Sequence, residues 1–525
     1  MNDQKHTSVS RPGPKFVRRV DLTPVIRLYI GITAVLAHQQ KQWGVITQLA
    51  RKYLISRTFV YLLACQVEQA GETLFAPERM GARLPVEEER LPYVYLLSLR
   101  LEGGSSLNAM STMMTRFGLR WSSVGKLSQS LQAIGGLLDN TISTPDETIQ
   151  LMVFSSDELF AGAQPILVTV EPQSSVILRI ELTDTRRWED WKRHWECLYD
   201  NGCHALYLVC DGGQALAKAH KESLSDVLLQ PDTYHALAHV LGPWKVRLEK
   251  RAYAAITAEY DRLKKLDSAR SEAVINTRIE QYEQARRNAD AAIARFDDVA
   301  YLYHELHEQL SVFDETGQLR DRTQAQAQMM TALELLDTLD LKSLSKAVAK
   351  TRRTLPELLN YFDVAQKVVP ALIRELPIAP ATFRLLCRAH HGHKRLMTAR
   401  TPEARQRCKA HERNALDRAA KDSTYTGEIR EHVYEQLDHI VQSSSMVECI
   451  NSILRPYLDT TRNQVSQEFL NLLMFYHNHR RYRAGKRAKH TPMELFTGQA
   501  QTADWLDLLC EEIERKQPGF FAASH

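Results

Sequence analysis

A long stretch without proline in the middle of the chain constrains the fold most. Between Trp244 and Leu355 the sequence has no proline and a single glycine, Gly317, and it is rich in Ala, Glu, Gln, Lys, Arg and Leu. Proline breaks helices and glycine weakens them, so this composition predicts long helices. We expect an all-helical region from residue 244 to residue 440. A coiled-coil partner module at RIEQYEQARRNADAAIARFDD is an alternative for part of it.

Four short runs before this region have a different periodicity. They are TIQLMVFS (148–155), ILVTVE (166–171), VILRIEL (176–182) and ALYLVC (205–210). Such β-branched and apolar runs, bounded by turn residues, predict strands. Trp188, Trp191 and Trp195 recur at helical spacing between the third and fourth runs and predict a helix that packs on the sheet. The order of these elements predicts an α/β layer domain.

Two helical hairpins are predicted before the strands. In the first, Leu54, Ile55 and Ser56 interrupt helical spacing, and in the second the turn falls at Gly118. No acidic residue lies between Lys41 and Gln66 or between Gly103 and Leu138, and the first twenty residues form a basic arm with five Lys and Arg against one acid. Because cationic side chains attract phosphates, we expect tandem helix-turn-helix units that bind DNA. Hairpins that merely pack together are the alternative.

The overall composition points to a soluble intracellular protein, and we expect a cytoplasmic, nucleoid-associated location. The formal net charge is only +4, so the position of the charges matters more than their sum. Eight cysteines are spread without a Cys-x-x-Cys pair, which fits a reducing compartment. No secretory signal and no apolar run of about 18 residues is found, so no membrane partner is expected.

The segment SSSMVECINSILRPYLDTTRN (443–463) predicts a helix that begins near Ser445 and has two distinct faces. Its polar face carries Glu448, Asn451, Ser452 and Arg455, and Val447, Ile450 and Leu454 form the apolar face. Such a helix presents a carboxylate while its back packs on a core. The alternative is a capping box, in which Glu448 only satisfies the amide of Ser445.

Two further motifs follow in order, YHNHRRYR (476–483) and TPMELF (491–496). Together with SMVECINSILRPYL, this arrangement resembles the carboxy-terminal part of DDE transposases and retroviral-type integrases. The resemblance covers residues 443 to 497 well. It extends more loosely to the strands from 148 to 211 and to the tandem helix-turn-helix start.

The resemblance implies an RNase H-like fold with a catalytic carboxylate triad. One Asp ends the first strand, a second ends the fourth strand, and a Glu lies on a late helix; the matching positions are Asp157, Asp211 and Glu448. The long separation of Glu448 from Asp211 implies a large insertion. Glu158 is an alternative to Asp157, because both residues are expected at the end of the strand. Asp211 precedes Gly212 and Gly213 and could instead be a turn aspartate.

The chemistry of phosphodiester cleavage and strand transfer fits such a triad. It needs two divalent metal ions about 3.5 to 4 Å apart, and Mg²⁺ prefers hard oxygen ligands. We therefore expect two Mg²⁺ ions held by Asp157, Asp211 and Glu448, with Mn²⁺ able to substitute. No nucleotide cofactor or covalent nucleophile is implied. His235, which follows Asp232 in a D-x-x-H-like stretch, and Asn451 and Arg455 are expected as accessory residues.

Cationic and histidine side chains in three regions are expected to contact DNA phosphates or bases. The second helices of the two hairpins, Arg57 to Gln66 and Arg120 to Gln129, would enter major grooves. The expected DNA contacts are Arg51, Lys52, Arg57, Arg120, Lys126, His477, Arg480, Arg481, Arg483, Lys486 and Arg487. A solvated basic face is the alternative for the last of the three regions.

Two similarly spaced pairs, Cys387-x-x-His390 and Cys408-x-x-His411, could hold a structural Zn²⁺ in the helical region. Their spacing matches no zinc-finger family that we can name. Coincidence in a His-rich region is therefore the favoured interpretation, and zinc is not expected as a cofactor.

These observations predict a multidomain α/β plus all-α protein that acts as a DNA transposase. The expected parts are a basic arm (1–30), a first helix-turn-helix (31–85), a second (86–142), an RNase H-like core (143–243), a helical insertion (244–440), the final part of the core with a basic segment (441–497), and a C-terminal helix and tail (498–525). Expected partners are terminal inverted repeats, target DNA and a second copy of the chain, in a homodimer or higher oligomer. A domesticated DNA-binding regulator without cleavage and an RNase H-like nuclease without strand transfer are the alternatives.

Overall fold

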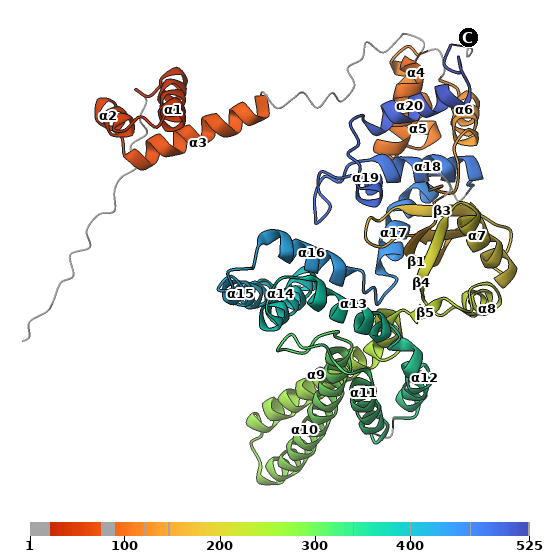
Figure 1. Ribbon diagram of the computed structural model, residues 1–525. Coiled ribbons are helices and arrows are strands. Elements are labelled where there is room, and N and C mark those ends of the chain that lie inside the picture. Colours follow the sequence, from red (N-terminus) through yellow and green to blue (C-terminus); the bar gives the residue numbers. More distant parts are fainter. Residues whose placement is uncertain are drawn as a thin grey trace, which may run out of the picture. The chain divides into compact units, whose positions relative to one another are not determined.

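The computed structural model describes residues 21–74, 90–119, 122–144, 148–339, 341–399, 401–461 and 464–522. The chain forms two compact units that divide after residue 85 (Figure 1). Residues 1–20 of the expected basic arm (1–30), and Arg120, lie outside the described residues. Within the described ranges, no helix is both long and apolar enough to cross a membrane.

The first unit consists of the helices α1 (Pro24–Gln39), α2 (Val45–Lys52) and α3 (Arg57–Leu74). Its core contains Ile30, Leu49 and Val60. The predicted break between two short helices is confirmed: Leu54 has φ 51° and the Ser56 hydroxyl accepts a hydrogen bond from the amide of Phe59 at 3.1 Å. The structure adds α1, which packs against α3 and completes a three-helix core.

The second unit contains a five-stranded mixed sheet with the order β3-β2-β1-β4-β5. Its strands are β1 (Gln150–Ala161), β2 (Gln164–Val170), β3 (Ile177–Leu182), β4 (Cys203–Cys210) and β5 (Leu228–Pro231). The first three strands are antiparallel neighbours, whereas β4 runs parallel to β1 and to β5. The four predicted strands are confirmed, and β5 is a fifth that the sequence analysis missed.

Helices cover both faces of this sheet. On one face lie α7 (Trp188–Asp200) and α8 (Gln214–Ser223), and the fully buried Trp191 and Trp195 of α7 fill the core there. The tryptophan spacing therefore marks core packing, as expected. On the other face, α17 (Ser445–Thr460) and α18 (Gln467–His479) share a second apolar cluster with β1, β2 and β3.

A buried polar network lies between the sheet and α7. The His194 ring contacts Glu181 Oε2 at 3.0 Å through Nδ1 and Thr169 Oγ1 at 3.0 Å through Nε2. Arg179 pairs with the same Glu181 carboxylate at 3.0 Å. Burial opposes the charge of Glu181, but these partners outweigh it and lower its pKa to about 2, whereas burial lowers the pKa of His194 to about 4.

Replacing Glu181 by Gln is expected to lower the free energy of unfolding by about 2 kcal/mol at neutral pH. The carboxylate has a lower pKa in the folded than in the unfolded chain. Its stabilisation is therefore present above the unfolded pKa, about 4.3, and is lost as pH falls toward about 2. Thermal melting at neutral pH checks the loss, with the exposed Glu196→Gln as the matched control. Equal melting temperatures for both variants would contradict it.

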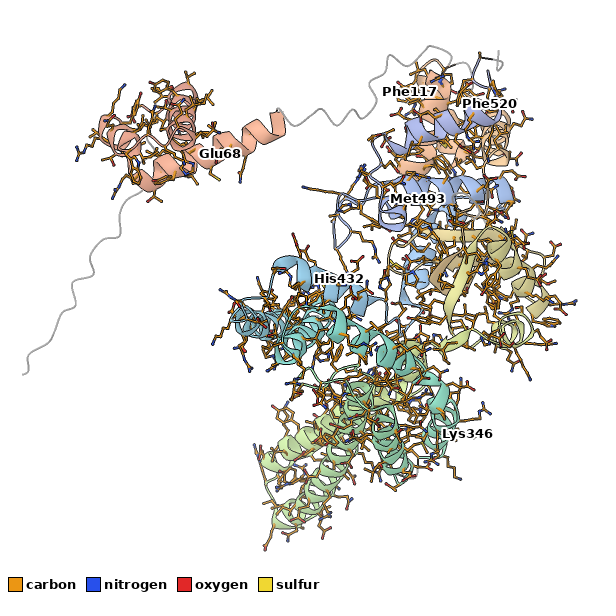
Figure 2. All side chains as sticks on the ribbon, viewed as in Figure 1. Glu68, Phe117, Lys346, His432, Met493 and Phe520 are labelled. Carbon is orange, nitrogen blue, oxygen red and sulfur yellow. The ribbon has the colours of Figure 1, made fainter. Side chains whose placement is uncertain are left out.

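The helices expected as a second separate helix-turn-helix instead share one apolar cluster with the sheet domain. They are α4 (Leu91–Leu97), the π-helix η1 (Ser98–Glu102), α5 (Leu107–Arg116) and α6 (Val124–Gly136), and α20 (Trp505–Lys516) packs with them. A Cβ at Gly135 would lie 1.9 Å from the backbone oxygen of Glu468, so α6 contacts α18 directly. Figure 2 labels Phe117 and Phe520 at this end of the unit, where they contact Tyr95 and Tyr93 of α4.

The predicted all-helical region is confirmed from residue 242 to residue 438. Its helices are α9 (Gly242–Asp267), α10 (Glu272–Gln309), α11 (Arg322–Asp337), α12 (Lys342–Leu358), α13 (Tyr361–Glu375), α14 (Pro380–Thr398), α15 (Pro402–Ala419) and α16 (Gly427–Asp438). They have an apolar core of their own, and α9 and α10 pack side by side as a long hairpin (Figure 1). This region leaves the sheet domain after β5 and returns to it before α17.

Candidate active site

The sequence predicts Asp157 at the end of the first strand, but the structure places it inside β1. β1 continues to Ala161 because its second half pairs with β2, with Asp157 opposite Val168. In the parallel pairing of β1 with β4, Ser155 is opposite Val209. Two residues further along each chain are Asp157 and Asp211, so the register brings these two carboxylates to the same level of the sheet.

The position of Asp157 inside a strand separates it from Glu158. Successive side chains of a strand point to opposite faces. Asp157 points to the α17 face, where Asn451 Nδ2 donates to its Oδ2 at 2.8 Å. Glu158 points to the α7 face, where it pairs with Arg186 at 3.1 Å and accepts from Trp191 Nε1 at 3.4 Å. Strand alternation therefore favours Asp157 over Glu158 as the residue of this site.

Asp211 directly follows β4 and is exposed. Its Oδ1 accepts a hydrogen bond from the amide of Gly213 at 2.8 Å, and Gly212 has φ 79°. The turn that the alternative interpretation expected is thus present. The turn uses one carboxylate oxygen, and the negative charge of Asp211 still raises the pKa of Asp157.

Glu448 lies in the first turn of α17, on the half-buried side of the helix. Val447, Ile450 and Leu454 are buried, so the predicted apolar face is confirmed. The N-cap is Ser444 rather than Ser445, and α17 has no side-chain capping bond. The capping-box interpretation of Glu448 is therefore wrong.

The electrostatics of Asp157 connect the three carboxylates. The pKa of Asp157 is raised to about 7, mainly by burial and also by the negative charges of Asp211, Glu448 and Glu158, against a backbone hydrogen bond that lowers it. Asn451 is fully buried, and while its Nδ2 donates to Asp157, its Oδ1 is buried and has no hydrogen-bond partner among the described residues. The site thus combines mutually repelling carboxylates with an orphaned amide oxygen.

The described residues contain no group of three or more His, Cys, Asp or Glu side chains close enough to hold a metal ion as they stand. The donor set Asp157, Asp211 and Glu448 nevertheless has the chemistry that Mg²⁺ prefers, because it supplies only carboxylate oxygens. A cation between them would relieve the repulsion that raises the pKa of Asp157.

The four side chains considered for zinc have other surroundings. Nε2 of His390 is 3.0 Å from Asp438 Oδ1, and Nε2 of His411 accepts from Arg388 Nε at 3.0 Å. Cys387 is fully buried, which raises the pKa of its thiol, whereas Cys408 is half-buried on α15.

The other two expected accessory residues are His235, which precedes the helical insertion in the sequence, and Arg455, which follows it. His235 opens the π-helix η3 (His235–His239), and its backbone amide donates to Asp232 Oδ1 at 2.7 Å. Its Nδ1 is buried and finds no hydrogen-bond partner in the part of the chain that the structure describes. Its ring lies 4.4 Å from that of His239. Arg455 is exposed on α17, two turns beyond Glu448 and on the same face.

The expectation that His477 contacts DNA is wrong. His477 is 1% exposed, and its Nε2 hydrogen-bonds the carbonyl of Ser175 at 2.9 Å. Burial lowers its pKa to about 4, so the ring is neutral at pH 7. The neighbouring Asn478 bonds both the amide and the carbonyl of Ile177, at 2.9 and 3.0 Å. This part of the motif holds the β2–β3 turn and the edge strand β3.

Several cations of the basic segment also bind the protein itself. Arg487 donates to the carbonyls of Pro172 and Gln173, Arg481 pairs with Glu494 at 2.7 Å, and Lys486 pairs with Asp438. Arg480 lies over the ring of Tyr476, 5.3 Å from its centroid. Arg483 is exposed and has no ion pair among the described residues.

The remaining cations differ in exposure. Arg51 and Lys52, at the end of α2, and Arg57, at the start of α3, are all exposed. Lys126 is half-buried near the start of α6. These three exposed cations therefore lie on both sides of the turn between α2 and α3.

Comparison of the chain with protein-family models and with curated proteins gives no match.

Proposed function

We propose that the protein is a DDE-type DNA transposase, which binds the ends of a mobile element and catalyses metal-dependent phosphodiester cleavage and strand transfer. The observation that carries this proposal is the coupling of three carboxylates from distant parts of the chain. Asp211 and Glu448 both raise the pKa of Asp157, although an all-helical region separates them in the sequence. Clusters of carboxylates with perturbed pKa values are typical of functional sites.

The sheet supports the same proposal. An RNase H-like core is consistent with three antiparallel strands followed by two parallel ones in the order β3-β2-β1-β4-β5, with helices on both faces. In the proposed site, Asp157 comes from β1, Asp211 follows β4, and Glu448 comes from α17. Strand ends and a packed helix are rigid supports for such groups.

Asp157, Asp211 and Glu448 would hold two Mg²⁺ ions, for which Mn²⁺ can substitute. Bound divalent ions activate a water or 3′-hydroxyl nucleophile and stabilise the leaving oxygen. Asn451 orients the Asp157 carboxylate through its 2.8 Å hydrogen bond. His235 and Arg455 are proposed to contact the phosphate near the scissile bond.

Exposed cations supply the proposed DNA contacts. In the first unit, α2 and α3 would act as a helix-turn-helix whose second helix enters the major groove, with Arg51, Lys52 and Arg57 beside it. Bringing two element ends together would require at least two copies of the chain on the DNA.

The experiment that tests this function supplies Mg²⁺ and a duplex that carries the ends flanking the native gene. The expected products are cut ends and, with target DNA present, joined strands. A nuclease would give no joined product from a pre-cleaved end and target DNA, whether or not it cuts that end further. A regulator would bind the same ends and yield no product with Mg²⁺ or Mn²⁺.

Arg483→Ala is expected to weaken DNA binding several-fold at about 0.1 M salt without changing the melting temperature, because its cation is exposed and forms no ion pair with another described residue. Arg487→Ala is the contrasting variant, since it removes hydrogen bonds to Pro172 and Gln173 and should lower the melting temperature. Fluorescence anisotropy with labelled duplex and thermal melting check both. Identical effects of the two variants would contradict this division of roles.

A further inference from the structure

Asp232 follows the last residue of β5 and contacts three segments of the chain at once. Its backbone amide donates to the carbonyl of Cys210 at 2.8 Å. Its Oδ1 accepts from the amide of His235 at 2.7 Å, and its Oδ2 accepts from the amide of Ser444 at 2.7 Å and from the Ser444 hydroxyl. The residue is 2% exposed, and both of its carboxylate oxygens are occupied. In the sequence, Asp232 is the first residue of the D-x-x-H-like stretch that ends at His235.

Each of these contacts leads to a residue of the candidate site. Cys210 directly precedes Asp211. Ser444 is the N-cap of α17, and the carbonyl of Ser444 accepts a hydrogen bond from the amide of Glu448 at 3.1 Å. Thr233 strengthens the connection, because its amide and hydroxyl both donate to the carbonyl of Gln442, at 3.1 and 3.0 Å. The loop that enters α17 is thus hydrogen-bonded to the segment that leaves β5.

The position of this connection matters because the local chain cannot place Glu448. Asp232 and Ser444 are 212 residues apart, and the helical insertion lies between them. The insertion has an apolar core of its own, so its packing does not by itself determine where α17 starts. The contacts of Asp232 and Thr233 close the base of the insertion and tie its two ends together.

We propose that Asp232 is a positioning residue, which fixes the first turn of α17 across the base of the insertion and so sets the place of Glu448 relative to Asp157 and Asp211. The hydrogen-bonded connection stands on its own contacts, whereas its effect on catalysis rests on the proposed function. An Asn at this position keeps one acceptor oxygen but turns an NH₂ group toward the amide of either His235 or Ser444, which are both donors. Losing one acceptor of a buried pair leaves an unsatisfied donor.

The test uses the full-length chain and compares Asp232→Asn and Ser444→Ala with Asp226→Asn. Asp226 is exposed and lies six residues earlier, so it is a matched control for the loss of one charge. Hydrogen exchange of the peptide that covers residues 442 to 450 reports the connection directly. We expect exchange there to be about tenfold faster in Asp232→Asn, about two- to fivefold faster in Ser444→Ala, and unchanged in Asp226→Asn.

Mg²⁺-dependent cleavage reports the consequence of the connection. In Asp232→Asn, kcat should fall about 10- to 100-fold and the Mg²⁺ concentration for half-maximal rate should rise, while the KM for DNA stays within about twofold. A purely structural role would lower the fraction of active protein without shifting the metal dependence. Ser444→Ala is expected to show the same pattern more weakly, and it provides a readout if Asp232→Asn does not fold.

Unchanged exchange in both variants would overturn the proposal, and so would faster exchange with unchanged kcat and metal dependence. If the wild-type chain cuts no DNA with either metal, the proposed function fails. Exchange of residues 442 to 450, together with calorimetric titration of Mn²⁺ into wild type and variants, then decides the positioning role: faster exchange with weaker Mn²⁺ binding supports it, and any other result overturns it.

Discussion

Replacing Asp157 by Asn, Asp211 by Asn or Glu448 by Gln is expected to reduce Mg²⁺-dependent DNA cleavage and strand transfer by about 10³-fold or more. Each change removes a carboxylate that is proposed to bind Mg²⁺, and a loss of about 4 kcal/mol of transition-state stabilisation corresponds to this factor. The residues come from β1, from the end of β4 and from the first turn of α17. Single-turnover cleavage of the native element ends is the measurement.

Glu158→Gln is the matched control for the Asp157 variant. Glu158 is the next residue on the same strand, but it faces α7 and pairs with Arg186. Its replacement should therefore change the cleavage rate by no more than a few-fold. Loss of activity in Glu158→Gln with retention in Asp157→Asn would reverse the assignment made from strand alternation. Activity that survives Glu448→Gln would remove α17 from the site.

The second large effect concerns stability as a function of pH. The pKa of Asp157 is raised to about 7 by burial and by neighbouring negative charges. The unfolded chain releases this proton near pH 4. The folded chain therefore binds more protons than the unfolded chain between about pH 4 and pH 7, and the free energy of unfolding falls as pH rises through this window. The contribution of Asp157 to this fall is about 2 to 4 kcal/mol.

Asp157→Asn should remove this contribution, so the variant is expected to be more stable than wild type above about pH 7 and to lose the advantage near pH 4. Thermal melting between about pH 4 and pH 8 checks the difference, with the exposed Asp184→Asn as the control. Mn²⁺ should raise the melting temperature of wild type above pH 7 and should have little effect on Asp157→Asn. A constant difference between the two proteins across the pH range would contradict the raised pKa.

The same carboxylate shows how far the sequence could locate the site. The apolar run from 148 to 155 predicts a strand that ends near Asp157, and on that basis Asp157 and Glu158 are equivalent. Pairing with β2 extends the strand to Ala161 and gives the two residues opposite faces. The extension depends on backbone hydrogen bonds to a neighbouring strand, so no local pattern in β1 could settle it.

The motif YHNHRRYR is one of the three on which the resemblance to DDE transposases rests, but its composition predicts the wrong role for its first histidine, His477. A run of His and Arg without an acid predicts phosphate contacts. In the folded chain, His477 and Arg487 bind backbone carbonyls of the β2–β3 turn, and Arg483 remains exposed. Cationic composition does not reveal which side chains a distant turn already occupies.

The sequence by itself determined the elements whose signals are local. The absence of proline after Trp244 predicts the helical region. The spacing of Val447, Ile450 and Leu454 predicts the buried face of α17, because apolar residues three to four positions apart lie on the same side of a helix. Only the tertiary structure decided which groups meet. The alignment of Asp157 with Asp211 and the contact of Asp232 with Ser444 depend on strand pairing and on loop closure across the insertion. These contacts join residues far apart in the chain. Bringing such residues together costs loop-closure entropy, and this cost is offset only when the whole unit packs.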